Sequence, residues 1–139
     1  MKGLYLDTSA VLRAIIETGF TPDIELAIQE ADVLITSRLS LVEASRVLIR
    51  TRNTGELSER QIADAERELN ALWDRCEIWE LSKSVCDSAR QIAPTQNLRA
   101  LDALHLATYL LARRRFEGIE LLTADERLQT AARVISGSH

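Results

Sequence analysis

The sequence is poor in cysteine, proline and glycine, and each shortage narrows the class of protein. Its 139 residues include two cysteines, Cys76 and Cys86, and neither has a histidine at ligand spacing, so the sequence does not predict a zinc site. Two prolines and five glycines are too few for a low-complexity or disordered chain. Because 46% of the residues are hydrophobic, a chain of this length can bury a hydrophobic core without stabilising cross-links and is predicted to form one domain.

Long hydrophobic runs are also missing. The most apolar stretch, residues 101–112, contains Asp102 and His105 and is too short and too polar to span a membrane. The first residues form no apolar run with a cleavage site. We therefore expect a cytoplasmic protein with reduced thiols and no membrane association.

An excess of basic residues is absent as well. The chain has 21 acids and 17 bases, and its net charge of −4 argues against a protein that holds nucleic acid by charge alone. A nuclease remains open, because bound cations would offset a local cluster of acids. Only Lys2 and Lys83 are lysines, so the bases are mainly arginines, which suit phosphates and carboxylates but also serve as ordinary solvated surface.

Short β-type runs alternate along the chain with longer segments of helical periodicity. One or two helices separate successive strands, which predicts parallel strands joined by crossovers in a three-layer α/β domain. Residues 1–135 are predicted to form this single domain and 136–139 a frayed tail. The helix at 39–52 and the helix that opens at Ser58 are expected to form a hairpin. The predicted strands are 3–7, 32–37, 76–81 and 119–123, and the predicted helices are 9–18, 21–30, 39–52, 58 onward, 84 to before Pro94, 99–115 and 125–134.

Four acids differ from the majority, which fall on polar helix faces. Asp7 ends the first strand, and Asp125 lies two residues past Thr123 at the end of the last strand. Glu43 and Asp102 lie in the first turns of helices, among apolar neighbours. In a parallel sheet, strand ends and the starts of the following helices meet at one edge, so we expect these four acids to converge there.

Carboxylates that converge in one pocket need a counter-charge. They raise one another's pKa, and a buried unpaired charge costs several kcal/mol. An all-oxygen ligand set without Cys or His indicates Mg²⁺ or Mn²⁺ rather than zinc. We expect Asp7 and Asp102 to be direct ligands, and Glu43 and Asp125 to hold a second ion or to orient its waters.

Plainer interpretations of three of these acids remain open. Asp7 could cap the helix that follows it, and Asp125 could do the same for the last helix. Glu43 could pair with Arg46 or Arg50 along its own helix. An acid between apolar neighbours, as Asp102 is, has no such simple alternative.

Nearby polar residues also have two interpretations each. Thr8, Ser9 and Thr123 could orient the carboxylates or the waters of a metal ion, or they could be helix caps. His105, three residues after Asp102, is interpreted as a helix-packing histidine with a satisfied hydrogen bond rather than as a catalytic group.

Four short segments give the chain a resemblance to the PIN-domain family, and within it to the VapC-type toxins. The resemblance covers nearly the whole chain, from residue 2 to about residue 134. It implies a three-layer α/β/α PIN-like domain with a central parallel sheet of four or five strands and a protruding helical hairpin. The matching segments are Leu6-Asp7-Thr8-Ser9-Ala10, Ser40-Leu41-Val42-Glu43-Ala44, Leu101-Asp102-Ala103-Leu104-His105-Leu106-Ala107 and Leu122-Thr123-Ala124-Asp125.

The same resemblance implies a Mg²⁺- or Mn²⁺-dependent endoribonuclease. A water made more acidic by the cation would attack the phosphodiester and leave a 5′-phosphate and a 3′-hydroxyl. The protein would be the toxin of a type II toxin–antitoxin pair, a homodimer that cleaves cellular RNA and so inhibits translation and growth. A small VapB-type antitoxin would bind across the helical hairpin, and DNA would be reached only through that antitoxin. The family's acidic quartet matches Asp7, Glu43, Asp102 and Asp125, and its accompanying hydroxyls match Thr8, Ser9 and Thr123.

Two other functions stay open at this point, a PIN-domain nuclease that processes RNA without an antitoxin and a catalytically silent interaction module. The intact acidic quartet speaks against the silent module. A ribonuclease with paired histidines is disfavoured, because only His105 and His139 are present. An aspartyl-phosphate phosphatase would need a second acid where Ser9 stands.

Overall fold

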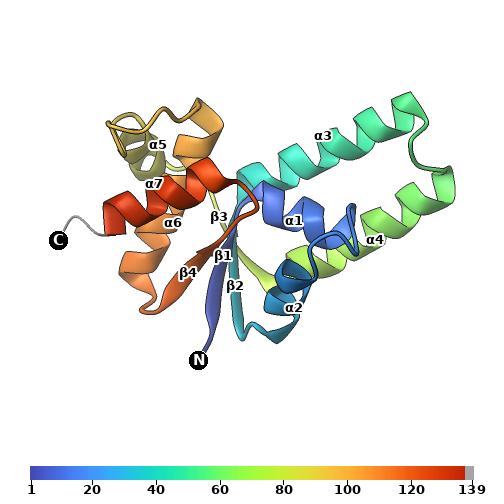
Figure 1. The fold of residues 1–139 in the computed structure, drawn as a ribbon, viewed down its shortest axis with the longest axis horizontal. Helices are drawn as coiled ribbons and strands as arrows, with labels where there is room; N and C mark the ends of the chain where they lie inside the picture. The colour runs from blue at the N-terminus through green and yellow to red at the C-terminus, as the bar shows by residue number, and fades with distance from the viewer. Residues whose placement is uncertain (137–139) are drawn as a thin grey trace.

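The computed structural model describes residues 1–136 and has four strands and seven helices in that range (Figure 1). Strands and helices alternate as the sequence predicts, so the α/β class is confirmed. The strands are β1 (Gly3–Leu6), β2 (Val33–Ser37), β3 (Cys76–Trp79) and β4 (Ile119–Leu122); the helices are α1 (Thr8–Ile15), α2 (Pro22–Glu30), α3 (Arg38–Thr54), α4 (Glu59–Arg75), α5 (Lys83–Ala89), α6 (Ala100–Arg115) and α7 (Glu126–Ser136).

The sheet is parallel throughout, with the strand order β3-β2-β1-β4. Leu4 of β1 pairs with Leu34 of β2 on one side and with Glu120 of β4 on the other. The chain moves outward from β1 to β2 to β3 and then returns past β1 to form β4. The order therefore reverses between β1 and β4, and in open α/β sheets ligands bind outside the carboxyl ends of the strands at such a point.

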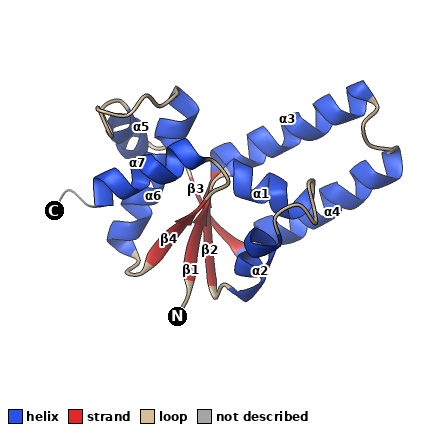
Figure 2. Ribbon diagram, viewed as in Figure 1, coloured by secondary structure: helices blue, strands red, loops and turns tan. Residues whose placement is uncertain are grey.

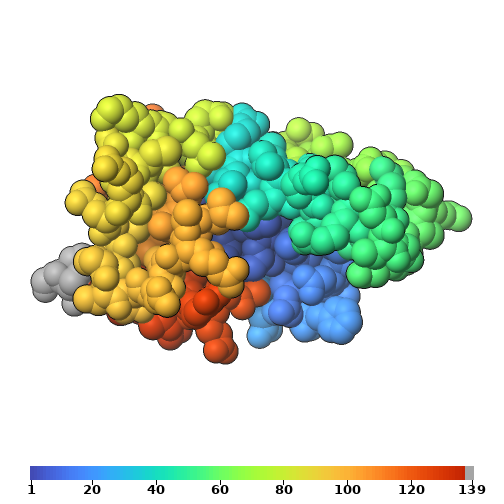
Figure 3. Space-filling model, turned by 90° about the horizontal axis from the view of Figure 1, so that it is seen from above, coloured from blue at the N-terminus to red at the C-terminus, as the bar shows by residue number. Residues whose placement is uncertain are grey.

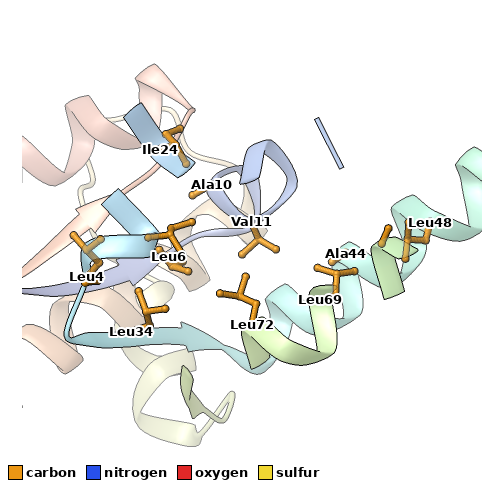
Figure 4. Packing of buried hydrophobic residues seen from close by; sticks show 13 residues of the cluster. Leu4, Leu6, Ala10, Val11, Ile24, Leu34, Ala44, Leu48, Leu69 and Leu72 are labelled. Atoms are coloured by element: carbon orange, nitrogen blue, oxygen red, sulfur yellow. The ribbon is translucent and has the colours of Figure 1, made fainter. Parts of the chain in front are cut away.

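Helices cover both faces of the sheet and make two separate hydrophobic clusters (Figure 2). Successive residues of a strand point to opposite faces, so Leu4 and Leu6 belong to one cluster and Tyr5 to the other. The first cluster packs β1 and β2 against α1 to α4, and Figure 4 shows Leu6 and Val11 within it. The second packs the opposite face against α6 and α7. These three layers hold the carboxyl ends of β1 and β4 in fixed positions.

Helices α3 and α4 form the expected hairpin, which extends beyond the sheet (Figure 1). Gly55 follows α3 with a φ of 74°, a left-handed conformation that glycine adopts without strain. The predicted capping box is present at the start of α4, where the Ser58 hydroxyl accepts from the Gln61 amide and the Gln61 side chain accepts from the Ser58 amide. Both ends of the turn are therefore specified locally.

Helix α6 is buried on most sides, which explains its apolar sequence. Leu106, Ala107 and Ala112 are fully enclosed, and Tyr109 is nearly so. No helix within residues 1–136 combines the length and the apolar character needed to cross a membrane.

The ends of several elements differ from those that the sequence predicts. Helix α1 ends at Ile15 rather than near residue 18, and α5 ends at Ala89, well before Pro94. Ser136 is the last residue of α7, where its hydroxyl accepts a hydrogen bond from Arg113, rather than part of a tail. The rest of the predicted tail lies outside the described residues.

Candidate active site

A pocket of about 550 Å³ opens at the carboxyl edge of the sheet, where β1 and β4 end. Figure 3 views the molecule from this side, where the blue N-terminal segment lies between the cyan region of α3 and the orange and red regions of α6 and α7. The pocket volume lies within the roughly 300–1,000 Å³ typical of ligand sites. The four acids that the sequence singles out all line it: Asp7, Glu43, Asp102 and Asp125.

Asp7 is the most enclosed of the four, with 4% of its surface exposed. It caps α1, because its Oδ1 accepts from the Ala10 amide at 3.0 Å. Its carboxylate also accepts from the Ser9 hydroxyl at 2.8 Å and from the Thr123 hydroxyl at 2.6 Å. Burial raises the pKa of Asp7 above its ordinary value, although the hydrogen bonds from Thr123, Ala10 and Ser9 oppose that shift. The protein therefore holds a poorly hydrated carboxylate in a fixed orientation.

Glu43 is held by residues from other elements and not by its own helix. Its Oε1 accepts from the Thr8 hydroxyl at 2.5 Å and lies 3.0 Å from His105 Nε2. Desolvation alone would raise the pKa of Glu43, but the hydrogen bonds from His105 and Thr8 outweigh it and lower that pKa. The alternative pairing with Arg46 or Arg50 is wrong for the described structure, since neither guanidinium contacts Glu43 within residues 1–136.

His105 packs in the interior, as the sequence predicts, and is 3% exposed. Its Nδ1 lies 2.9 Å from the Tyr5 hydroxyl, and its Nε2 lies 3.0 Å from the hydroxyl of Thr8. With the Tyr5 hydroxyl at Nδ1 and the Glu43 carboxylate at Nε2, both ring nitrogens have a hydrogen-bond partner. His105 thereby fixes Glu43, a role that its position three residues after Asp102 does not disclose.

Asp102 and Asp125 complete the pocket in different ways. Asp125 Oδ1 accepts from the backbone amides of Arg127 and Leu128, so the predicted capping interpretation is confirmed for this acid. Asp102 is half-buried, and among residues 1–136 its carboxylate has neither a hydrogen-bond partner nor an ion pair. Asp102 is therefore the acid that is most available to a ligand.

The three predicted supporting hydroxyls all contact this set of acids. Thr8 donates to Glu43, while Ser9 and Thr123 lie 3.1 Å apart and both donate to Asp7. Ser40, which the sequence does not single out as a site residue, has its hydroxyl 2.8 Å from that of Thr36 and 3.4 Å from that of Thr8, and so anchors the start of α3 below the pocket. In the sequence, the one signal that marks Ser40 is its place between two leucines in an apolar helical turn.

The donor chemistry suits a hard divalent cation. Every acid that lines the pocket offers carboxylate oxygens, the ligands that Mg²⁺ and Mn²⁺ prefer, and no cysteine lines it. Within residues 1–136, no three His, Cys, Asp or Glu side chains are already gathered closely enough to hold a metal ion. The residues therefore fit such an ion by type and position, while Asp7, Glu43 and Asp125 are hydrogen-bonded to neighbouring groups of the protein.

Comparison with known proteins agrees with this fold. Residues 4–134 match the PIN domain. The chain therefore belongs to the PIN-domain family, and its relatives are VapC-type members.

Two curated relatives from Mycobacterium tuberculosis share this sequence along almost its whole length. Ribonuclease VapC45 of strain CDC 1551 / Oshkosh and ribonuclease VapC49 of strain H37Rv are each 31% identical over 134 residues. Each alignment covers 95% of this chain and 90% of the relative.

Two solved structures share the fold. The crystal structure of PAE2754 from Pyrobaculum aerophilum superposes with a TM-score of 0.65 at 18% identity, covering 96% of this chain and 86% of that one. VapBC2 from Rickettsia felis, solved bound to a DNA fragment from its promoter, superposes with a TM-score of 0.58 at 14% identity. This match covers 88% of this chain and 99% of that one. These likenesses support the three-layer architecture.

Proposed function

We propose that this protein is a divalent-metal-dependent endoribonuclease and the toxin of a type II toxin–antitoxin pair. One observation carries the proposal: carboxylates from four distant parts of the chain line a single pocket at the point where the strand order reverses. The relatives named ribonuclease VapC support RNA as the substrate class.

Asp7, Glu43, Asp102 and Asp125 would hold Mg²⁺ or Mn²⁺ in this pocket. The ion would supply Lewis acidity, which makes a water acidic enough to attack the phosphodiester and offsets charge on the reacting phosphate. Asp7 gains most from a cation, because burial has removed the water that would otherwise stabilise its charge.

Neighbouring polar residues hold two of these carboxylates in fixed orientations. Ser9 and Thr123 fix both oxygens of Asp7, so the carboxylate cannot rotate away from the pocket. His105 and Thr8 keep Glu43 ionised and aimed. Hydrolysis at this site would leave a 5′-phosphate and a 3′-hydroxyl.

The relatives also support a biological setting for this activity. VapBC2 of Rickettsia felis is a complex bound to promoter DNA, which supports a small antitoxin partner that brings DNA recognition. We propose a cytoplasmic homodimer that the antitoxin neutralises and that otherwise stops growth by cleaving cellular RNA.

Cleavage of RNA with mapped ends tests the proposal. Purified protein should cut single-stranded RNA in Mg²⁺ or Mn²⁺, stop when chelator is added, and leave 5′-phosphate ends. Asp7→Asn should abolish cutting, whereas Asp74→Asn, which changes an exposed acid of α4, should cut like the wild type. Cleavage that persists in chelator, or an Asp7→Asn protein that cuts at the wild-type rate, contradicts the assignment.

Expression in cells tests the toxin role separately. Wild-type protein should slow growth and Asp7→Asn should not. A protein that cleaves RNA in vitro yet leaves growth unchanged would favour RNA processing without an antitoxin.

A further inference from the structure

Arginines flank the acidic pocket on two sides. Arg46 and Arg50 of α3 line the main pocket beside the carboxylates. A second pocket of about 420 Å³ is lined by Arg99 and Arg127. The two pockets share the walls formed by Glu43, Leu101, Asp102 and Asp125, so they adjoin as one groove across the acids.

These four arginines are not engaged elsewhere. Among residues 1–136, the guanidiniums of Arg46, Arg50 and Arg99 have no hydrogen bond and no ion pair. Arg127 has only a contact of 3.9 Å with Asp125. Some surface arginines outside the groove pair with acids, namely Arg13 with Glu17, Arg38 with Glu80, Arg52 with Glu59 and Glu66, and Arg67 with Asp64. Others in the described part of the chain, such as Arg60 and Arg114, pair with no acid, but they lie outside both pockets. The groove therefore holds unused positive charge in a chain whose net charge is −4.

Helical spacing places Arg46 and Arg50 on one side of α3. Residues four apart on a helix lie about 5–6 Å from each other at Cβ. Glu43 precedes Arg46 by three residues and lies on the same side, so this face of α3 passes from a carboxylate to two guanidiniums. Arg99, the N-cap residue of α6, and Arg127, in the first turn of α7, stand on the other side of the acids.

The pocket walls favour contact with a phosphate backbone over stacking of bases. Aliphatic side chains such as Leu12, Val42 and Leu101 line the main pocket, and no Phe, Tyr or Trp of the described chain does. Strands that bind through stacked bases use aromatic platforms. Affinity here would have to come mainly from the arginines.

We propose that a single strand of RNA crosses the carboxylates in this groove, with Arg46 and Arg50 binding phosphates on one side of the cut and Arg99 and Arg127 binding phosphates on the other. The inference rests on the proposed function and adds how the substrate is held. A single strand fits better than a duplex, because Asp7 is 4% exposed and the phosphodiester has to bend into the pocket to approach it. Arginine suits this contact, because its planar fork binds phosphate oxygens in pairs.

Binding measured without cleavage tests the two pairs of arginines. Arg46 and Arg50 form one arm of the groove, and Arg99 and Arg127 form the other. Fluorescent single-stranded RNA is titrated in Mg²⁺ with an Asp7→Asn protein over a range of salt. Replacing both arginines of either arm with alanine should reduce the slope of log K against log salt by about 1.4, at roughly 0.7 for each phosphate contact on a single strand. Arg60→Ala with Arg114→Ala, an exposed pair outside both pockets, removes the same charge and should leave the slope unchanged.

Shortened RNA substrates test which arm binds the RNA on each side of the cut. In the same background, shortening the RNA on one side of the cut should weaken binding to the intact groove but not to the variant that lacks the arm on that side. The other arm should show the opposite preference. Equal slopes for both arms and the control pair, no RNA binding at all, or both arms responding to the same end would overturn the proposal. Because binding is read without catalysis, an RNA-binding protein that cleaves nothing would count against the proposed function and not against the groove.

Discussion

Asp7 serves two structural purposes with the same pair of oxygens. It caps α1 through the Ala10 amide and receives hydroxyl hydrogen bonds from Ser9 and Thr123, yet it also lines the pocket. A carboxylate has about four lone-pair directions, so capping does not exhaust its capacity to bind a ligand. The capping interpretation and the metal-ligand interpretation are therefore compatible for this residue.

Replacing Asp7 should not cost stability at neutral pH. Because its folded-state pKa is raised above the ordinary 3.8, the carboxyl stabilises the fold below that pH, and this contribution is lost as pH rises through the folded pKa. Asn keeps the shape and the cap acceptor without the charge. In chelator at pH 7, Asp7→Asn should melt at the same or a higher temperature than the wild type, and the difference should shrink toward pH 4. A lower melting temperature at pH 7 would contradict this electrostatic account.

The side chain of His105 contacts residues from much earlier in the chain, including Tyr5, which lies 100 positions before it. Removing its ring takes one hydrogen-bond partner each from the Tyr5 hydroxyl, Thr8 and Glu43, while the bond between Thr8 and Glu43 remains. Because each lost hydrogen bond contributes about 0.5–1.5 kcal/mol, His105→Leu should lower the free energy of unfolding by about 2 kcal/mol or more. His105→Gln, which keeps a donor and an acceptor, should lose less in urea denaturation. Equal losses would show that packing, and not hydrogen bonding, sets the cost.

The pairing of β1 with β4 depends on a close approach at Gly3. A Cβ at this position would collide with Cδ1 of Ile119, a buried residue of β4. From this pair, β1 and β4 run side by side to Asp7 and Thr123, which are hydrogen-bonded to each other past the other end of the two strands.

A double-mutant cycle tests that approach. Gly3→Ala should destabilise by about 1–3 kcal/mol through overpacking. Ile119→Val removes the colliding atom and should cost about 0.5–1.5 kcal/mol alone. In urea denaturation, the double variant should lose clearly less unfolding free energy than the sum of the losses of the two single variants. Strict additivity would mean that the two side chains do not meet.

Element ends were predicted less well than element types. Strand β1 ends at Leu6, one residue before the predicted end at Asp7, and Arg99 is the N-cap of α6, although the sequence predicts it as the first residue of that helix. Helix α5 ends at Ala89, although the nearest proline stands five residues later. The end of a helix depends on which backbone groups find tertiary partners, and local sequence does not encode those partners.

At the scale of the whole molecule, the sequence predicted the site better than its internal contacts. Alternating strands and helices indicate a parallel sheet, and its shared edge brings Asp7, Glu43, Asp102 and Asp125 to one pocket. The contact between Glu43 and His105 spans 62 residues and depends on how α3 and α6 pack across the sheet edge. Periodicity identifies the buried face of each helix but not which side chains meet between helices.

Cation binding should also be visible in global stability. An ion that binds only the folded chain stabilises it by mass action, by about 2.7 kcal/mol at 100 times its dissociation constant. Mg²⁺ or Mn²⁺ should therefore raise the melting temperature of the wild type by several degrees and that of Asp7→Asn by much less. A melting temperature that is indifferent to both ions and to chelator would argue against cation binding in this pocket.

Anomalous diffraction from crystals soaked in Mn²⁺ tests the central claim most directly, because it locates the ion without relying on catalysis. We expect a peak within the pocket, between Asp7 and Asp102 and near Glu43 and Asp125, and no such peak in crystals of Asp7→Asn. Well-diffracting wild-type crystals that show no peak among these carboxylates at saturating Mn²⁺, or a peak only elsewhere on the surface, would contradict the account.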